Sequence, residues 1–143
     1  MSNPHFQALE RMYLAGPINR FYAPTISIKA SEAAIEITLG EKFHHSAGAV
    51  HGCVYFKMLD DAAFFAVQSL ETKVFVLTAT FTTYLIRPVS MGKLRSVGKV
   101  VSRSATQFIA EAVVYNENDK EIGRGSGVFV KGKLPLAHAL GYA

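Results

Sequence analysis

One acidic residue stands out among the side chains that could do chemistry, because it lies in the most apolar part of the chain. Asp60 falls within residues 50–70, and on a helix its neighbours would be apolar or small: Cys53, Phe56, Ala63 and Val67. A carboxylate is costly to bury without a partner, and burial raises its pKa, so Asp60 is a candidate catalytic base. The alternative is a structural carboxylate that accepts hydrogen bonds from threonines of a neighbouring strand.

A second candidate is the start of the helix that we predict over about residues 51–70. Gly52 lies in its first turn, where backbone N–H groups lack partners within the helix and the helix dipole favours negative charge. The backbone at Gly52 could therefore stabilise a developing oxyanion.

Other chemistry is less well supported in this region. Metal-ligating atoms occur in His44, His45, His51 and Asp60. Their spacing matches no metal signature, so we predict no metal site. A nucleophilic Cys53 would need an adjacent base, and His51 is only two residues away. We therefore expect Cys53 to be a small buried thiol.

The remaining charged groups have ordinary structural interpretations. Lys57 and Asp61 are four residues apart on the predicted helix, which favours a solvent-exposed ion pair. Basic residues that we expect to lie mostly on a solvated strand face occur later, at Lys93, Arg95, Lys99 and Arg103. The alternative is that some of these, with Arg87 or Arg124, hold phosphate groups.

The hydrophobic pattern predicts the elements that must position these residues. They are a short helix over residues 4–15, extended chain over 26–39, a loop over 40–50 and the long helix over 51–70. Four strands follow, over residues 74–86, 94–103, 107–116 and 121–131. One long apolar helix and about five strands are typical of a curved antiparallel sheet that embraces a helix.

Two strands carry features that bear on packing. The alternation over residues 74–86 predicts an apolar face made of Phe75, Leu77, Ala79, Phe81 and Leu85. In the last strand, the alternate glycines from Gly123 to Gly127 leave one face as bare backbone. Glycine weakens a strand, so we expect the long helix to approach this face closely.

Composition limits the class of protein. The chain has 143 residues, of which 50% are hydrophobic and 18% charged, which excludes a disordered segment and predicts one domain over residues 1–143. The net charge of +4 is diffuse, so we expect no nucleic-acid partner. Residues 1–16 lack the pattern of a secretory signal, and charged residues interrupt the apolar stretch, which argues against a membrane span. With one cysteine, which suits a reducing compartment, we expect a cytoplasmic protein.

The chain resembles the hot-dog-fold acyl-CoA thioesterases, specifically the phenylacetate-degradation (phenylacetyl-CoA thioesterase) type. Gly48, His51, Gly52 and Asp60 match the spacing of the family motif. The resemblance spans roughly residues 30–130 and continues through Tyr84, Arg87-Pro88, Gly92, Leu94, Gly98, Glu111 and Gly123-Arg124-Gly125.

The resemblance implies an α+β hot-dog fold, in which a curved antiparallel sheet of five to six strands wraps round one long central helix. It also implies dimers formed by edge-to-edge sheet pairing, commonly dimers of dimers, which hydrolyse an acyl-CoA or related thioester at the dimer interface without a cofactor. In such a site the Gly52 N–H polarises the thioester carbonyl. Asp60 of the facing subunit acts as general base or nucleophile, and Thr78 assists from the strand after the helix.

Three positions depart from the family pattern. His45 stands where the family usually has Asn, Cys53 replaces the second glycine of the motif, and Thr78 replaces the commoner Ser. A histidine can also donate a hydrogen bond, so His45 joins Gly52, Asp60 and Thr78 as a catalytic candidate. The candidates for contact with substrate are His51, Cys53, Phe64, Tyr84, Arg87 and Arg124.

Two other functions stay open. The missing Asn is compatible with a non-catalytic acyl-CoA-binding hot-dog module. A hot-dog hydratase or dehydratase is less favoured, because the dehydratase signatures surround their histidine with prolines and none lies between Pro24 and Pro88.

Overall fold

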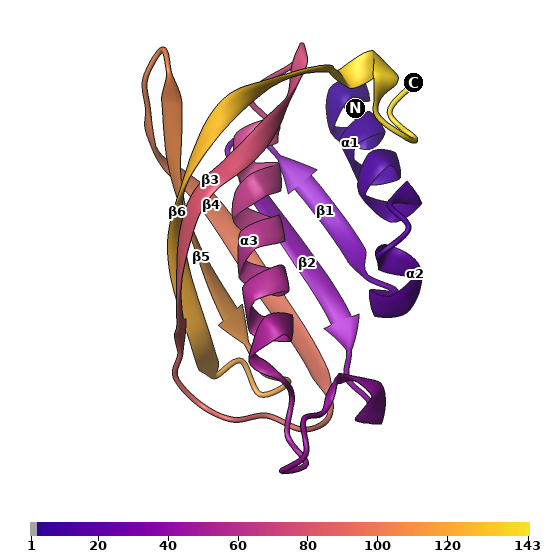
Figure 1. Cartoon of the computed structure of the whole chain (residues 1–143), viewed down its shortest axis with the longest axis vertical. Helices are drawn as coiled ribbons and strands as arrows, with labels where there is room; N and C mark the ends of the chain where they lie inside the picture. The colour runs from indigo at the N-terminus through magenta and orange to yellow at the C-terminus, as the bar shows by residue number, and fades with distance from the viewer. Residues whose placement is uncertain (1–2) are drawn as a thin grey trace.

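A curved sheet wraps around one long helix in the computed structural model, which describes residues 3–143 (Figure 1). The helices and strands are α1 (Pro4–Ala15), α2 (Asn19–Tyr22), β1 (Thr25–Lys29), β2 (Glu32–Thr38), α3 (Gly52–Gln68), β3 (Val74–Leu85), β4 (Lys93–Arg103), β5 (Gln107–Tyr115) and β6 (Glu121–Pro135). The strands form one antiparallel sheet in the order β1-β2-β4-β5-β6-β3. The predicted hot-dog fold is confirmed. Residues 1 and 2, which the predicted domain includes, lie outside the described residues.

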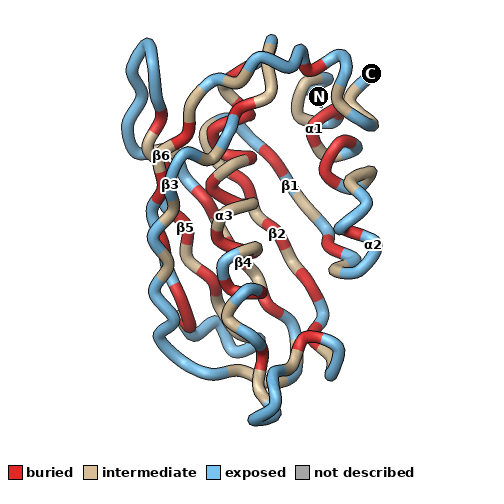
Figure 2. Tube along the Cα trace, in the orientation of Figure 1, coloured by how far each residue is buried: buried red, intermediate tan, exposed pale blue. Residues whose placement is uncertain are grey.

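Two features fix the long helix α3: a cap at its start and a close contact with the sheet. His51 caps it, because its side-chain Nδ1 accepts the Cys53 N–H at 3.0 Å. On β4, Gly98 lies so close to α3 that a Cβ atom there would overlap the backbone of Ala62. Buried residues accordingly follow α3 and the facing strands (Figure 2). Among residues 3–143, no helix is both long and apolar enough to cross a membrane.

The extended chain predicted over residues 26–39 is a hairpin of two strands, β1 and β2. Their register pairs Lys29 with Glu32. The turn depends on Ser31, whose φ of 65° lies in the left-handed region. Its N–H donates to Ser69 Oγ at the end of α3, at 2.8 Å. The sequence prediction missed the turn because a tertiary contact, and no local glycine or asparagine, stabilises this conformation.

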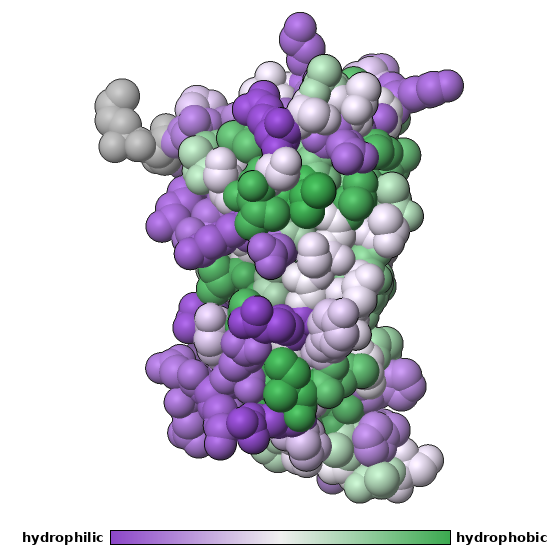
Figure 3. All heavy atoms as spheres, turned by 90° about the vertical axis from the view of Figure 1, so that its left-hand side faces the viewer, coloured by the Kyte–Doolittle hydropathy of each residue, from purple (hydrophilic) through white to green (hydrophobic). Residues whose placement is uncertain are grey.

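The predicted apolar face of β3 is correct only in part, because the strand is irregular: Phe75 and Phe81 pack against the core, whereas Leu77 and Ala79 are exposed. The register with β6 shifts between Val74 and Val76 and again between Thr78 and Thr80, so that alternate residues do not keep to one face along the whole strand. Between the two shifts, Val76 is fully buried, and half of Leu77 is exposed. Exposed apolar residues therefore lie among polar ones on the outer side of the molecule that Figure 3 presents.

The glycines of β6 are covered only in part as predicted. A Cβ atom on Gly127 would lie 2.5 Å from the Phe81 ring, and one on Gly125 would overlap the same ring. At Gly125 and Gly127 the close approach therefore comes from a side chain of the neighbouring β3, whereas at Gly123 the ring of Tyr55 on α3 lies 3.2 Å from the Cβ position, as expected for a helix that covers this face.

Candidate functional site

The Asp60 carboxylate lies at the middle of α3, next to β3. Thr78 Oγ1 donates a hydrogen bond to Asp60 Oδ1 at 2.9 Å, which is the one side-chain hydrogen bond that the described residues give to this carboxylate. Burial raises the pKa of Asp60 to about 6, against the lowering effect of the Thr78 hydrogen bond. The structure contains the apolar environment that marked Asp60 as a catalytic candidate, and also the threonine partner that the structural alternative predicted.

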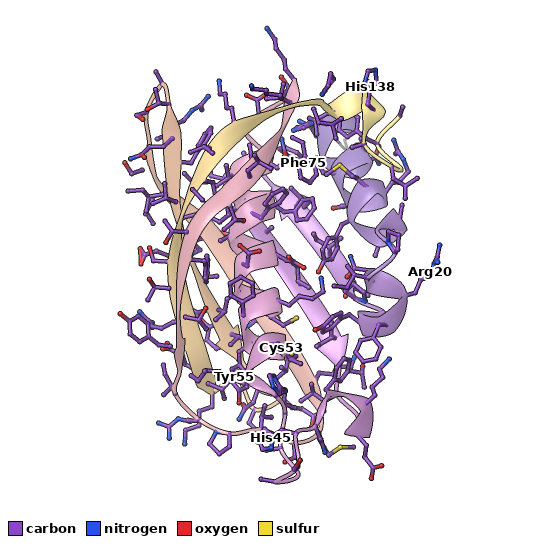
Figure 4. All side chains as sticks on the ribbon, viewed as in Figure 1. Arg20, His45, Cys53, Tyr55, Phe75 and His138 are labelled. Atoms are coloured by element: carbon purple, nitrogen blue, oxygen red, sulfur yellow. The ribbon has the colours of Figure 1, made fainter. Side chains whose placement is uncertain are left out.

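A cavity of about 460 Å³ opens beside Asp60 and Thr78. Its walls come from α1, the turn between α1 and α2, one side of α3, the start of β3 and residues 134–140. Phe64 of α3 and Phe75 of β3 contact each other there, with ring centroids 5.2 Å apart. Figure 4 shows Phe75 beside the upper part of α3 and His138 on the C-terminal segment above it. The carboxylate therefore lies at the wall of a largely apolar and aromatic cavity.

A second, separate cavity of about 300 Å³ surrounds the start of α3. Gly52, His45 and Arg87 line it together with residues 85–88. The Tyr55 hydroxyl donates to the Arg87 carbonyl at 2.7 Å and so fixes the loop that follows β3. Gly52 and Asp60 are eight residues apart on α3, which is about 12 Å along a helix. One chain therefore does not bring the predicted oxyanion donor and the predicted base to a common point.

The histidines near α3 mainly organise the backbone of this region. His45 Nδ1 accepts the Ala47 N–H at 3.0 Å, and His51 is the cap of α3. His44 Nε2 lies 2.8 Å from the Ser90 carbonyl oxygen. In residues 3–143, no three side chains of His, Cys, Asp or Glu converge as a metal site would require.

The prediction that Cys53 is buried is wrong, because this thiol is exposed. Cys53 lies in the first turn of α3, on a helix side that also exposes 43% of Phe56. Figure 4 places Cys53 near the lower end of α3 and His45 in the loop below it.

The predicted substrate contacts fall into separate groups. Phe64 lines the cavity beside Asp60, and Arg87 lines the cavity beside Gly52. Tyr84 and Arg124 instead meet on the outer surface of the sheet, where they line a smaller depression of about 110 Å³. Arg124 is already paired there with Glu121, at 2.7 and 2.8 Å. Within one chain these two residues are not part of the Asp60 site.

Lys57 and Asp61 form the expected ion pair, but the pair is not solvent-exposed. Lys57 Nζ lies 2.5 Å from Asp61 Oδ2, and only 12% and 19% of the two side chains are accessible. The Tyr13 hydroxyl of α1 donates to the same Asp61 oxygen at 2.7 Å. Tyr13, Lys57 and Asp61, which we term the Lys57 cluster, all line the cavity beside Asp60. The sequence pattern on α3 contains no signal for Tyr13, which lies 44 residues before Lys57.

The basic side chains of β4 lie on the solvated face of this strand, as expected. Three of them pair with surface carboxylates: Lys93 with Glu36 at 3.4 Å, Arg95 with Asp119 at 3.6 Å, and Lys99 with Glu32 at 3.7 Å. Such exposed pairs contribute little to stability.

Comparison with known proteins places these residues in a wider group. A family model described as the thioesterase superfamily matches residues 47–122, a span that contains Gly52, Asp60 and Thr78. The structure is similar to that of the E. coli PaaI protein from the phenylacetic acid degradation operon, with a TM-score of 0.84 and 17% identity over 92% of this chain and 96% of that chain. A Haemophilus influenzae thioesterase gives a TM-score of 0.77 and 14% identity over 87% and 88% of the two chains. A variant of a Staphylococcus aureus thioesterase gives a TM-score of 0.75 and 15% identity over 80% of this chain and 98% of that chain. No curated protein sequence matches the chain.

Proposed function

Since this chain belongs to the thioesterase superfamily, we propose that it is an acyl-CoA thioesterase, which splits a thioester into a carboxylic acid and free CoA. Asp60 removes a proton from the water that attacks the carbonyl and displaces the CoA thiolate, or attacks the carbonyl itself, displaces the thiolate and forms an anhydride that water then hydrolyses. Thr78 orients its carboxylate. The observation that carries this proposal is the Asp60 carboxylate, held by Thr78 at the wall of an apolar cavity. A pKa raised by burial to about 6 suits a base that works at neutral pH.

The Gly52 backbone supplies the second requirement, which is stabilisation of the oxyanion. Its N–H lies in the first turn of α3, where the helix dipole favours negative charge. Because Gly52 and Asp60 of one chain are about 12 Å apart along the helix, one thioester carbonyl does not reach both. The complete site therefore takes Asp60 from one chain and Gly52, with His45, from a second copy.

Strand β3 is the proposed contact between the two copies. It is an outer strand of the sheet and pairs only with β6 among the described strands. Leu77 and Leu85 on this strand are 50% and 56% exposed. An exposed edge strand is a template for pairing with another chain, so that two copies of β3 would join the sheets into a dimer. Such dimers then associate in pairs.

The cavity beside Asp60 is the proposed place of the acyl group. Its volume of about 460 Å³ lies within the usual range of small-molecule sites, and Phe64 and Phe75 suit an aromatic or aliphatic acyl group. E. coli PaaI belongs to the phenylacetic acid degradation operon, which makes phenylacetyl-CoA the first substrate to test. Arg87, in the cavity beside Gly52, is the proposed contact of the CoA phosphates.

Complementation between two inactive variants tests the shared site. Asp60→Asn removes the base, and Gly52→Pro removes the N–H donor. Proline is well tolerated at the first position of a helix, and the preceding His51 already has the extended ψ of 144° that a proline requires. We expect each variant alone to release almost no thiol from phenylacetyl-, benzoyl- or hexanoyl-CoA.

The two variants are then unfolded together, mixed and refolded. Half of the resulting dimers are mixed, and each mixed dimer has one intact site of two, so we expect about one quarter of the wild-type activity to return. Activity that stays at the level of the separate variants would exclude a site shared between chains. Full activity of Asp60→Asn would exclude Asp60 as base or nucleophile.

A non-catalytic acyl-CoA-binding module is the second candidate, and one observation favours it. His45 replaces the usual Asn, and its Nδ1 already accepts the Ala47 N–H, which leaves only Nε2 for a ligand. Thermal-shift measurements with CoA and acyl-CoA, alongside the thiol-release assay, separate the two functions. Binding without turnover of any acyl-CoA would select the module.

A further inference from the structure

Lys57 is placed to pair with either of two neighbouring carboxylates. On α3 it lies three residues before Asp60 and four before Asp61, and side chains at both spacings are neighbours on a helix. Its ammonium contacts Asp61 Oδ2 at 2.5 Å, whereas the hydrogen bond to Asp60 comes from Thr78. The Asp60 carboxylate therefore stays out of the ion pair, although an ammonium group is within reach.

Contacts from α1 and α2 favour Asp61 in this competition. The Tyr13 hydroxyl donates to Asp61 Oδ2 at 2.7 Å, which adds a second donor to that oxygen. The Lys57 ammonium lies 5.1 Å from the centre of the Tyr13 ring and 4.9 Å from the centre of the Tyr22 ring. Cations are attracted to aromatic faces at these distances. The ammonium is therefore held on the side of α3 that faces α1 and α2.

We propose that Asp61 and Tyr13 hold the Lys57 ammonium away from Asp60, so that Asp60 remains a free carboxylate able to accept a proton or attack a carbonyl. Asp61 is then a positioning residue, because it acts on Asp60 through Lys57 and touches no reacting atom. This inference rests on the proposed function for the role of Asp60. Its physical part concerns only the position of one ammonium group and is testable without substrate.

The titratable groups that face Asp60 come from three parts of the chain: Lys57 and Asp61 from α3, Tyr13 from α1, and His138 from the turn after β6. After the dominant effect of burial, the charge of Asp61 raises the pKa of Asp60 and that of Lys57 lowers it. Burial raises the pKa of Tyr13, so this phenol stays a neutral donor. An opposite charge brought next to a carboxylate lowers its pKa by about 1 to 3. Release of Lys57 toward Asp60 would therefore weaken the base.

A purely structural role for the Lys57 cluster predicts a different result. The cluster also joins α1 to α3, so that loss of Asp61 could lower stability without moving Lys57 to Asp60. Loss of the Asp61 charge alone would also lower the pKa of Asp60, but by the same amount whether or not Lys57 is present. The two explanations therefore differ in whether the effects of Asp61 and Lys57 are coupled.

Carboxyl titration by NMR measures this coupling directly. The chain has three aspartates, Asp60, Asp61 and Asp119, so protein labelled with ¹³C at aspartate carboxyls gives three signals. The Asp60→Asn and Asp61→Asn variants assign them. The pKa of Asp60 is then compared in the wild type, Asp61→Asn, Lys57→Met and the double variant.

We expect Asp61→Asn to lower the pKa of Asp60 by about 1 or more when Lys57 is present, and by less than half as much in the Lys57→Met background. An equal shift in both backgrounds means that no ammonium has moved, and it overturns the proposal. Tyr13→Phe, which removes only the hydroxyl donor, gives the same comparison if Asp61→Asn does not fold. Its expected shift has the same direction and is smaller.

Thioester hydrolysis supplies the functional readout. At pH 7 we expect Asp61→Asn to lower kcat for phenylacetyl-CoA by about tenfold or more, which is part of the roughly 10²- to 10⁴-fold that a general base contributes. Adding Lys57→Met should restore most of this loss, whereas a second substitution in a damaged structural cluster would not. If the wild type hydrolyses no acyl-CoA, the proposed function fails, and the titration still decides where Lys57 lies.

Discussion

Replacement of Asp60 by asparagine is expected to stabilise the folded protein at neutral pH. Burial raises the pKa of Asp60 from 3.8 to about 6, a difference of about 2.2. At 1.36 kcal/mol for each pKa unit, the ionised carboxylate lowers the free energy of unfolding by at most about 3 kcal/mol. Because the side chain is partly exposed, we expect solvent screening to reduce this penalty to about 1 to 2 kcal/mol.

The penalty depends on pH in a defined direction. An acid with a raised pKa in the folded state binds more protons when folded than when unfolded, here between about pH 4 and pH 6. The free energy of unfolding therefore falls as the pH rises through this window and stays level above it. The Asp60→Asn variant lacks this fall. It should be more stable than the wild type by about 1 to 2 kcal/mol at pH 7.5, and no more stable at pH 4.

Urea unfolding followed by circular dichroism measures this difference. The protein concentration is kept constant, because self-association would add to the apparent stability. Asp119→Asn is the matched control, since its side chain is 80% exposed on the turn between β5 and β6. If Asp60→Asn is less stable than the wild type by the same margin at both pH values, the reasoning is refuted.

Four further expectations concern the site and the fold. With a pKa of about 6, the ionised fraction of Asp60 rises from about 9% at pH 5 to about 91% at pH 7. The value of kcat/KM should therefore rise about tenfold over this range and then level off. A profile independent of pH would contradict this expectation. Thr78→Val removes the hydrogen bond that lowers this pKa and should move the rise to higher pH in the same steady-state assay. Gly98→Ala should lower the free energy of unfolding by about 1 to 3 kcal/mol, and so lower Tm, because the new Cβ atom overlaps the backbone of Ala62. The control Gly40→Ala should leave Tm unchanged, because no atom lies within 4 Å of the new Cβ atom. Equal Tm values for the two variants would exclude the close contact at Gly98. Sedimentation should give a dimer of about 31 kDa, twice the 15.6 kDa of the chain, or a pair of such dimers of about 62 kDa, and a monomer at micromolar concentration would contradict pairing through β3.

The sequence was most informative about residues whose arrangement depends on the spacing along a single helix. Asp60 could be selected because helical spacing alone places it among apolar residues, and the pairing of Lys57 with Asp61 follows from the same periodicity. The burial of that pair could not be predicted, since it depends on Tyr13 and Tyr22, which reach α3 only through the packing of α1 and α2. For the same reason, the helix period did not tell which side of α3 exposes Cys53.

In the strands, too, local sequence predicted the extent of an element but not the features that depend on tertiary contacts. The extent of β3 was predicted closely, but irregularities in its register with β6 turn Leu77 and Ala79 outward, while Phe75 and Phe81 of the same predicted face pack against the core. No glycine or proline marks these irregularities. The turn at Ser31 was missed similarly, because a hydrogen bond from the far end of α3 stabilises it.

The walls of the cavity beside Asp60 come both from residues within the span that matches the superfamily and from residues outside it. Asp60 and Thr78 lie within the residues shared with the superfamily, 47–122, whereas the walls from residues 12–19 and 134–140 lie outside that span. With the acyl group in this cavity, as proposed, the two ends of the chain act together with Phe64 and Phe75 to determine which acyl groups fit, and residues within the matched span perform the reaction. Exchange of the terminal segments between relatives would then change substrate preference while the chemical step is inherited intact.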